Sequence, residues 1–192
     1  MQTRDNFRYC AYYCEENVWQ LCQEDELQQQ QVCVVFVSNP QKSCALWNQR
    51  AAHSEDSAVV WDYHVLLLAF SEQTSGNGWK VWDLDTTLSF PCDARTYLQW
   101  TFAVGYSIPE EYRPLFRVMT REEYLLSFSS DRSHMRDDKG GWMKPPPPWP
   151  APFQESRGMN LHRFFEMEQG FVGDVLNLDE MWSRFVENTE EG

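Results

Sequence analysis

Three residues of the chain, Cys14, His64 and Asp83, have the types and the order of a thiol, imidazole and carboxylate catalytic triad. A thiol nucleophile, an imidazole base and a carboxylate that orients the imidazole are used together for acyl transfer. Cys14 stands at the start of a helix-like segment, whereas His64 and Asp83 lie in segments with strand composition. The elements that carry these residues must therefore bring them together.

The segment from Glu15 to about Gln30 has apolar residues at roughly helical spacing, and this pattern predicts one helix with Cys14 at its start. The unpaired N–H groups and the dipole of a helix N-terminus lower the pKa of a thiol. The neighbouring carboxylates of Glu15 and Glu16 act in the opposite direction. A single cysteine in a reducing compartment is more commonly a buried, inert thiol. The helix start and the later histidine narrow the difference between the two roles without reversing it.

The strand composition predicts an antiparallel hairpin between residues 59–70 and 79–84, joined by the turn-rich segment 71–78. If Phe70 faced Asn77 across this hairpin, His64 would directly face Asp83. Facing Cβ atoms lie about 4.5–5.5 Å apart on one side of the sheet. Two further strands are predicted over 32–37 and 44–47.

The same register would place Asp62 opposite Asp85, and two facing carboxylates repel unless a cation, a proton or water separates them. Either the strands diverge there and other donors satisfy each acid, or the acids form an anionic pocket for a substrate ammonium. Asp62 is the first candidate for that task, with Asp85, Glu15 and Glu16 as alternatives. The remaining histidines are predicted to be structural or surface groups; they are His53, His134 and His162.

Length and charge limit the classes of function. The chain has 192 residues with a net charge of −13, which suits one domain and disfavours nucleic acid and membrane-surface partners. The polar N-terminus and the short apolar runs predict a soluble, intracellular protein. Its six cysteines should then be reduced, and their spacing does not support a metal site. No cofactor is expected.

Local signals predict the rest of a single α+β domain over 1–192. Thr120 and Glu123 match a capping box that begins a helix, and Asn160 and Asn177 are typical caps of two closing helices. The segment 139–152 contains four consecutive prolines and predicts a rigid surface loop. The acidic tail 187–192 is predicted to be frayed.

Several motifs occur in one order along nearly the whole chain, and together they resemble the protein N-terminal glutamine amidohydrolase family. They are Cys14-Glu15-Glu16-Asn17, Val60-Trp61-Asp62-Tyr63-His64-Val65, Asp83-Leu84-Asp85-Thr86, Phe90-Pro91-Cys92, Ser130-Asp131-Arg132-Ser133-His134-Met135 and Pro145-Pro146-Pro147-Pro148. The resemblance implies an α/β fold, with a mainly antiparallel sheet, related to papain-like enzymes and transglutaminases. It also implies a monomer.

The resemblance implies that Cys14 is the nucleophile, His64 the base and Asp83 the orienting acid. The implied reaction converts an N-terminal glutamine of a protein or peptide into glutamate and ammonia through a γ-glutamyl thioester, as an early step of the Arg/N-degron pathway. We expect such an enzyme in the cytoplasm and also in the nucleus.

Two alternatives follow from the same residues. A cysteine peptidase or a transglutaminase-like transamidase could use the same triad, and would cleave peptides or incorporate amines in place of releasing ammonia. A non-catalytic interaction module could instead present residues 145–149 as a polyproline ligand. Packing of Trp142 and Trp149 onto the domain would favour a structural loop over that ligand.

Overall fold

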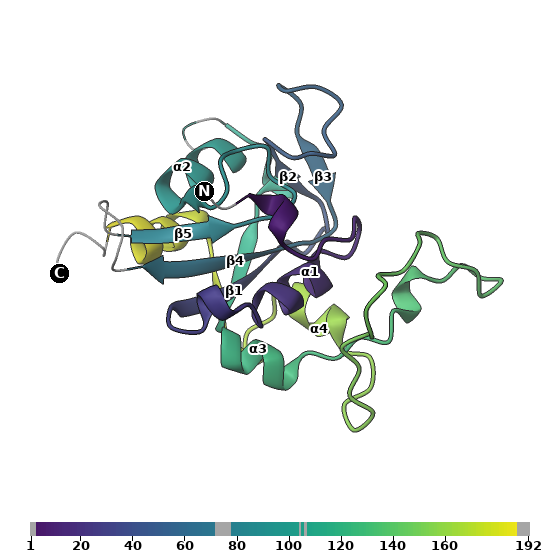
Figure 1. Ribbon diagram of the computed structural model, residues 1–192. Coiled ribbons are helices and arrows are strands. Elements are labelled where there is room, and N and C mark those ends of the chain that lie inside the picture. The colour runs from purple at the N-terminus through teal and green to yellow at the C-terminus, as the bar shows by residue number, and fades with distance from the viewer. Residues whose placement is uncertain (1–2, 72–77, 104, 106, 188–192) are drawn as a thin grey trace.

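The computed structural model describes residues 3–71, 78–103, 105 and 107–187. A six-stranded antiparallel sheet forms its centre, with the strand order β6-β5-β4-β1-β7-β8, and β2 and β3 form a separate two-stranded sheet (Figure 1). The strands are β1 (Gln31–Ser38), β2 (Cys44–Leu46), β3 (Val59–Trp61), β4 (His64–Ser71), β5 (Gly78–Trp82), β6 (Cys92–Asp93), β7 (Leu115–Thr120) and β8 (Asp174–Leu176).

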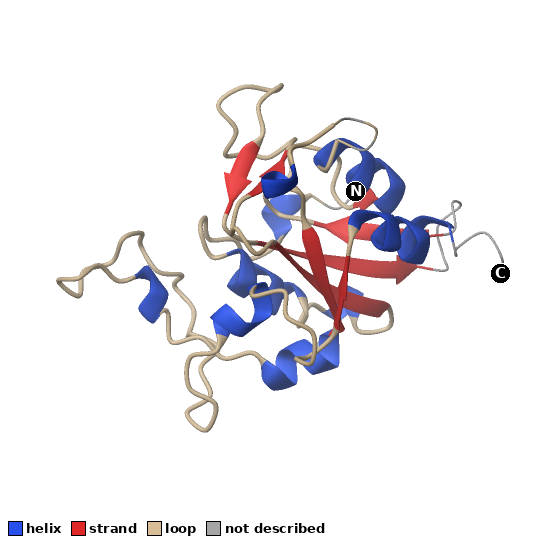
Figure 2. Cartoon of the chain, turned by 180° about the vertical axis from the view of Figure 1, so that it is seen from behind, coloured by secondary structure: helices blue, strands red, loops and turns tan. Residues whose placement is uncertain are grey.

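Helices cover both faces of the large sheet, as the two opposite views show (Figures 1 and 2). The α-helices are α1 (Cys14–Leu21), α2 (Ala94–Thr101), α3 (Arg121–Ser127), α4 (Leu161–Phe165) and α5 (Leu178–Trp182). Short 3₁₀ turns are η1 (Arg4–Asn6), η2 (Asp25–Leu27), η3 (Glu110–Tyr112) and η4 (Ser133–Met135), and η5 (Ser183–Glu187) is a π-helical turn.

The central strand β1 explains why there are two apolar cores. Successive side chains of a strand point to opposite faces, so Val34 and Phe36 join the core beneath α1, α3 and α4. Val35 and Val37 join the core beneath α2 and α5. Because β1 is buried on both faces, it reads in the sequence as a continuous apolar run.

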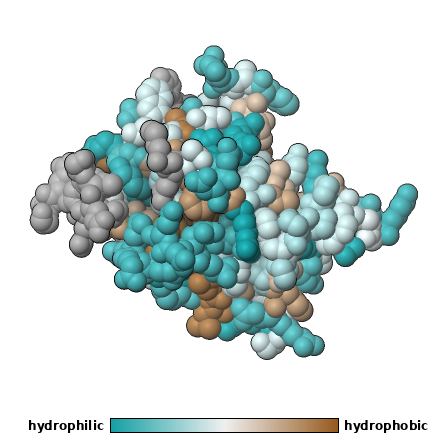
Figure 3. Space-filling view, in the orientation of Figure 1, coloured by the Kyte–Doolittle hydropathy of each residue, from teal (hydrophilic) through white to brown (hydrophobic). Residues whose placement is uncertain are grey.

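These features confirm the predicted α+β class with a mainly antiparallel sheet flanked by helices. The likeness to papain and transglutaminase folds stays a prediction. All six cysteines are free thiols, as expected. Among the described residues, the helices are too short or too polar to cross a membrane. The face drawn in Figure 3 is largely hydrophilic, with apolar side chains in small groups.

The first helix is shorter than predicted. It begins at Cys14, as expected, but ends at Leu21, and the remainder of the predicted segment forms turns and η2. The Gln28 side chain donates hydrogen bonds to the carbonyls of Cys22 and Glu24. Polar side chains of this kind satisfy carbonyl groups beyond a helix end, so the glutamine-rich segment closes the helix instead of extending it.

The predicted strand over 59–70 is divided in two. β3 pairs with β2 in the small sheet, β4 pairs with β1 and β5 in the large one, and the chain changes direction at Asp62 and Tyr63. The Ser38 hydroxyl donates to the Asp62 carbonyl at 2.6 Å and holds this bend. His64 therefore stands at the first position of β4.

The hairpin register differs from the prediction by two residues, since Phe70 pairs with Trp79; Asn77 lies outside the described residues. A shift of two residues keeps each side chain on its predicted face, whereas a shift of one would have reversed it. His64 and Asp83 consequently share a face, but they lie diagonally, and β5 ends at Trp82. Asp62 does not face Asp85, because Asp62 lies in the bend before β4. Of the two alternatives for these acids, divergence of the strands at this point is therefore the correct one.

Two of the three predicted helix caps are confirmed. Thr120 and Glu123 form the capping box of α3, and Asn177 forms one with Glu180 at α5. Asn160 occupies the cap position of α4, but its side chain bonds the backbone of residues 127 and 129 instead. Residues 139–152 form an irregular loop. The segment that leads into it projects from the body (Figures 1 and 2). Residues 188–192 of the acidic tail lie outside the described residues.

Candidate active site

Two hydrogen bonds between the Asn17 side chain and the Cys10 backbone hold the chain at the start of α1, where Cys14 lies. The Asn17 amide accepts a hydrogen bond from the Cys10 N–H at 2.8 Å and donates to the Cys10 carbonyl at 3.0 Å. Asn17 is itself buried. The loop over residues 10–17 is thereby closed, and the helix must begin at Cys14.

The sulfur of Cys14 is half-buried and lies against β4, where the backbone of Val65 hydrogen-bonds it. Burial raises the pKa of the Cys14 thiol well above its usual value, and the charges of Glu15 and Asp85 raise it further. The Val65 hydrogen bond lowers this pKa but does not compensate. The helix N-terminus therefore does not produce a resting thiolate, because burial and carboxylates dominate.

His64 and Asp83 form a buried pair, as the sequence predicted. Nε2 of His64 lies 3.0 Å from Oδ1 of Asp83, and the two side chains are 2% and 1% exposed. This contact leaves Nδ1 as the ring nitrogen for proton exchange with a reacting group. Trp61 stacks on the imidazole at 6.0 Å between ring centroids and restricts its orientation.

Both oxygens of Asp83 accept several hydrogen bonds. Besides His64, Oδ1 accepts from the Asp85 N–H at 2.9 Å, and Oδ2 accepts from the Tyr97 hydroxyl at 2.7 Å. Gln49 contributes a longer contact of 3.5 Å. Burial acts to raise the pKa of Asp83, but His64 and these hydrogen bonds outweigh it, so the pKa is lowered. Asp83 is thus held as a carboxylate.

The ionised Asp83 acts in turn on His64. Burial by itself would lower the pKa of the imidazole, but the charge and the hydrogen bond of Asp83 oppose it, with further contributions from Asp85 and Glu15. The net effect raises the pKa of His64 above 6.5. The ring is therefore a stronger base than a free histidine.

Sequence reasoning missed Tyr97 and Gln49. Tyr97 lies on α2, fully buried among apolar residues, and Gln49 belongs to the loop after β2. Neither residue forms a motif with His64 or Asp83. The sequence offered one signal for Tyr97: Asp93 is a typical helix cap, and its side chain does cap α2. A cap predicts where a helix begins, but not which face of the helix is buried.

Glu15 follows Cys14 directly and is completely buried. Its Oε2 accepts from the Tyr63 hydroxyl at 3.1 Å and lies 3.8 Å from the Cys14 sulfur. Its Oε1 lies 3.7 Å from Nε2 of His134. Burial and the nearby Glu16 raise the pKa of Glu15 to about 7. His134 was predicted to be a structural or surface group. It lies instead beside Glu15, the residue that follows Cys14.

The other two candidate acids occupy different surroundings. Asp62 is exposed, and one of its oxygens accepts from the Tyr63 N–H at 2.9 Å. Asp85 is half-buried, and its Oδ1 accepts from the Tyr9 hydroxyl at 2.5 Å. Desolvation and the charge of Asp83 raise the pKa of Asp85. All three acids raise the pKa of the Cys14 thiol, but each has a different burial and a different hydrogen-bond partner.

Glu16 attaches the proline-rich loop to α1. Its carboxylate forms two hydrogen bonds of 2.6 and 2.7 Å with the Arg132 guanidinium and accepts from the Trp149 indole at 2.9 Å. Arg132 also donates to the carbonyls of Pro147 and Trp149. The loop is therefore packed against the helix that carries Cys14, which argues against a freely presented polyproline ligand.

Within the described part of the chain, His64, Asp83 and Asp85 form the group that could hold a metal ion, since their ligand atoms all lie within 4.8 Å of one another. Both oxygens of Asp83 already accept hydrogen bonds from the protein. The arrangement suits an oriented imidazole better than a cation site. The absence of a metal and of a cofactor stays a prediction.

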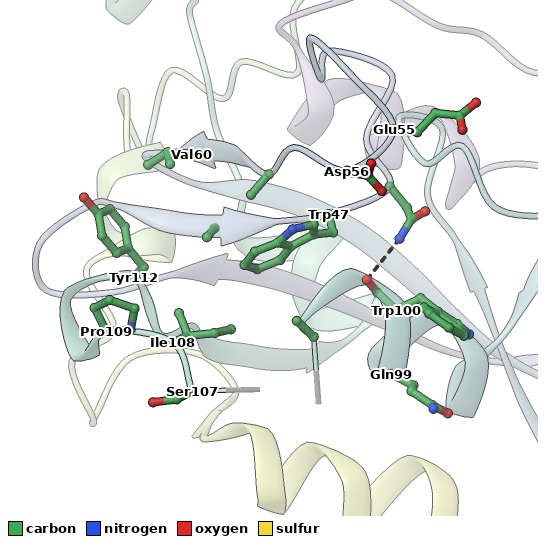
Figure 4. A pocket seen from close by; sticks show the side chains of 14 residues that line it. Trp47, Glu55, Asp56, Val60, Gln99, Trp100, Ser107, Ile108, Pro109 and Tyr112 are labelled. Carbon is green, nitrogen blue, oxygen red and sulfur yellow. Dashed lines mark hydrogen bonds between the residues drawn. The ribbon is translucent and has the colours of Figure 1, made fainter. Parts of the chain in front are cut away.

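A groove of about 870 Å³ lies elsewhere, between the small sheet, α2 and the loop before β7 (Figure 4). It combines aromatic and apolar walls with two carboxylates at one end; these residues include Trp47, Val60, Trp100, Tyr112, Glu55 and Asp56. Cys14, His64 and Asp83 do not line it. The groove is thus separate from the candidate triad.

Known proteins resemble this chain over most of its length. Residues 9–185 match the N-terminal glutamine amidase family. A protein of Homo sapiens named protein N-terminal glutamine amidohydrolase is 41% identical over 95% of this chain and 89% of its own length. Proteins of the same name from Bos taurus and Drosophila melanogaster are 41% and 39% identical, over 95% and 94% of this chain and 88% and 89% of their own lengths.

Proposed function

Because the chain belongs to the N-terminal glutamine amidase family, we propose that this amidase converts the side chain of an N-terminal glutamine in proteins or peptides into glutamate and ammonia. The substrates are then proteins or peptides with a free N-terminus. The observation that carries the proposal is the buried His64–Asp83 pair at the start of β4, where the backbone of the next residue contacts the Cys14 sulfur.

In the first step, the Cys14 sulfur attacks the side-chain amide carbon of the substrate. Since burial keeps the thiol protonated at rest, Nδ1 of His64 takes the proton as the carbon–sulfur bond forms. The tetrahedral intermediate then breaks its carbon–nitrogen bond, and His64 returns the proton to the departing ammonia. The product of this step is a γ-glutamyl thioester on Cys14.

In the second step, neutral His64 removes a proton from water, which attacks the thioester carbon. Collapse of this intermediate releases N-terminal glutamate and returns the proton to the Cys14 sulfur. Asp83 holds Nε2 of the imidazole throughout and stabilises its charged form. Tyr97 orients the carboxylate in turn.

The negative charge that develops on the amide oxygen requires hydrogen-bond donors. The first N–H groups of a helix have no acceptor within the helix, and in α1 they belong to Cys14 and the residues directly after it. Donors of this kind typically contribute about 3–4 kcal/mol to the stabilisation of an oxyanion. We assign them this role here.

The biological setting follows from the same proposal. An enzyme of this specificity would supply N-terminal glutamate to the Arg/N-degron pathway, in the cytoplasm and the nucleus, and would act as a monomer. Its net charge of −13 suits peptide substrates and disfavours nucleic acid as a partner.

The test uses three peptides that share one sequence after the first residue: a glutamine peptide, its acetylated form and an asparagine peptide. Wild type should release ammonia and add about one mass unit only to the glutamine peptide. Cys14→Ser should reduce turnover to background. Cleavage of the peptide, or incorporation of an added amine, would favour a peptidase or a transamidase, and an active Cys14→Ser variant would exclude Cys14 as the nucleophile.

A further inference from the structure

Three buried polar atoms beside Cys14 lack hydrogen-bond partners among the described residues. They are Oε1 of Glu15 and both ring nitrogens of His134. Each buried polar group without a partner costs roughly 1–3 kcal/mol. Since Oε1 and Nε2 lie only 3.7 Å apart, these atoms form one cluster that a single ligand could satisfy.

We propose that Glu15 and His134 form the site that binds the α-ammonium group of the substrate, and that they thereby restrict the enzyme to the first residue of a chain. This inference rests on the proposed deamidation of N-terminal glutamine. An α-ammonium group carries one positive charge and three N–H donors. A carboxylate oxygen and an imidazole nitrogen can each accept one of them.

Exposure orders the parts of this site. Glu15 is completely buried, whereas the Cys14 side chain is half-buried and that of His134 is 24% exposed. The carboxylate is therefore the most deeply buried group of the proposed site. An amine bound at Oε1 of Glu15 would lie next to Nε2 of His134.

The distances agree with the length of a glutamine side chain. Four bonds separate its α-nitrogen from its amide carbon, a span of about 5 Å when extended. Oε2 of Glu15 lies 3.8 Å from the Cys14 sulfur. An ammonium group bound at this carboxylate would therefore lie within the reach of one glutamine side chain of the Cys14 sulfur.

The charges of the two residues also fit a cationic ligand. Burial first, and then the charge of Glu16, raise the pKa of Glu15 to about 7. Burial lowers the pKa of His134, although Asp131 and Asp62 oppose this effect. Burial therefore disfavours the ionised carboxylate in the absence of substrate, and an arriving ammonium group favours it.

The other acids satisfy fewer of these requirements. Asp62 is exposed to solvent, which already stabilises its charge. Asp85 accepts a hydrogen bond from Tyr9 and contributes to the field at His64. Glu15 alone of these three acids combines complete burial with an oxygen that lacks a partner among the described residues.

The test separates binding from turnover by using Cys14→Ala enzyme and measuring peptide affinity by calorimetry. The probes are a glutamine peptide and its analogue in which a hydroxyl replaces the α-amine. We expect the Cys14→Ala enzyme to bind the amine peptide about 10³-fold more tightly, because the hydroxyl can donate only one hydrogen bond and brings no positive charge to the buried carboxylate. Adding Glu15→Gln should reduce this preference to about tenfold or less.

A second variant keeps the test valid if Glu15→Gln does not fold, which a thermal melt will reveal. His134→Phe should reduce the preference for the amine by about tenfold, since one acceptor is lost. Glu155→Gln, the same change at an exposed loop position, is the matched control and should leave it unchanged. An unaltered preference in a folded Glu15→Gln variant, or in His134→Phe, would overturn the assignment.

Two further outcomes are distinguishable. If Asp62→Asn or Asp85→Asn abolishes the preference and Glu15→Gln does not, the ammonium site belongs to that acid and the proposal is wrong. If wild type releases no ammonia while the amine preference still depends on Glu15, the proposed reaction fails and the binding assignment stands.

Discussion

The His64–Asp83 pair and the Glu15–His134 pair are both buried carboxylate–imidazole contacts near Cys14, yet they are built in opposite ways. In the first pair the two side chains are 3.0 Å apart, and both oxygens of the acid accept hydrogen bonds from the protein. In the second they are 3.7 Å apart, and one oxygen and both ring nitrogens lack partners among the described residues.

This difference shows up in the pKa values of the two acids. Hydrogen bonds and His64 lower the pKa of Asp83 against the effect of burial, whereas burial raises the pKa of Glu15 to about 7. The first pair is complete before substrate arrives, as a base that must be oriented requires. The second pair gains its missing interactions only from a ligand, as a selective binding site requires.

The largest effect is expected from breaking the complete pair. Asp83→Asn keeps the shape of the side chain but removes the charge that orients and stabilises the His64 imidazolium. Turnover at saturating glutamine peptide should fall by about 10³–10⁴-fold, with little change in KM. Ammonia release under saturation measures this. A variant with normal turnover would transfer the orienting role to Asp85.

Removing the charge of Glu15, in the incomplete pair, should raise the free energy of unfolding. Because the folded pKa of Glu15 lies above that of an unfolded glutamate, about 4.3, the folded state loses stability as pH rises from there to about 7. Glu15→Gln removes this titration and still accepts from Tyr63. It should raise the free energy of unfolding by about 1–3 kcal/mol above pH 7.

Urea denaturation on either side of this pH window measures that difference. The gain should shrink toward acidic pH, where Glu15 is protonated in both states. Glu155→Gln serves as the exposed control. A Glu15→Gln protein less stable than wild type at alkaline pH would contradict the view that burial outweighs the hydrogen bonds that this carboxylate accepts.

A smaller effect is expected from removing one partner of the complete pair. Tyr97→Phe deletes the hydroxyl that donates to Oδ2 of Asp83 at 2.7 Å. Hydrogen bonds to charged groups contribute about 1.5–3 kcal/mol, so turnover should fall by about tenfold or somewhat more. Tyr112→Phe, in the separate groove, is the control. Equal activity of the two variants would mean that Gln49 and the Asp85 N–H suffice to orient Asp83.

The smallest change concerns the pH profile. Activity requires neutral His64, and its pKa is raised, so kcat/KM should rise with pH through a limb above 6.5. Asp85 is one of the charges that raise this pKa. Asp85→Asn should therefore move the limb to lower pH. A limb that stays in place would exclude His64 as the titrating group or Asp85 as its neighbour.

Local signals predicted what depends on local chemistry. The capping boxes at Thr120 and Asn177, the helix start at Cys14 and the buried strand β1 were readable because each rests on neighbours in the chain. The length of α1 and the division of the predicted strand 59–70 at Asp62 could not be predicted in this way. The end of α1 depends on Gln28 side-chain bonds to the nearby carbonyls of Cys22 and Glu24, which have no simple sequence signature. The division at Asp62 depends on Ser38, which is distant in the sequence.

For the candidate site, the sequence by itself determined which residues could do the chemistry: Cys14, His64 and Asp83. It also placed His64 and Asp83 on the same face of the sheet, because side chains alternate along a strand and the register error was two residues. Only the tertiary structure decided which acids are buried and which have partners. Tyr97 and His134 reach the site from segments far from Cys14 in sequence. Burial and hydrogen-bond satisfaction, which set pKa values, depend on such distant contacts and leave no local pattern.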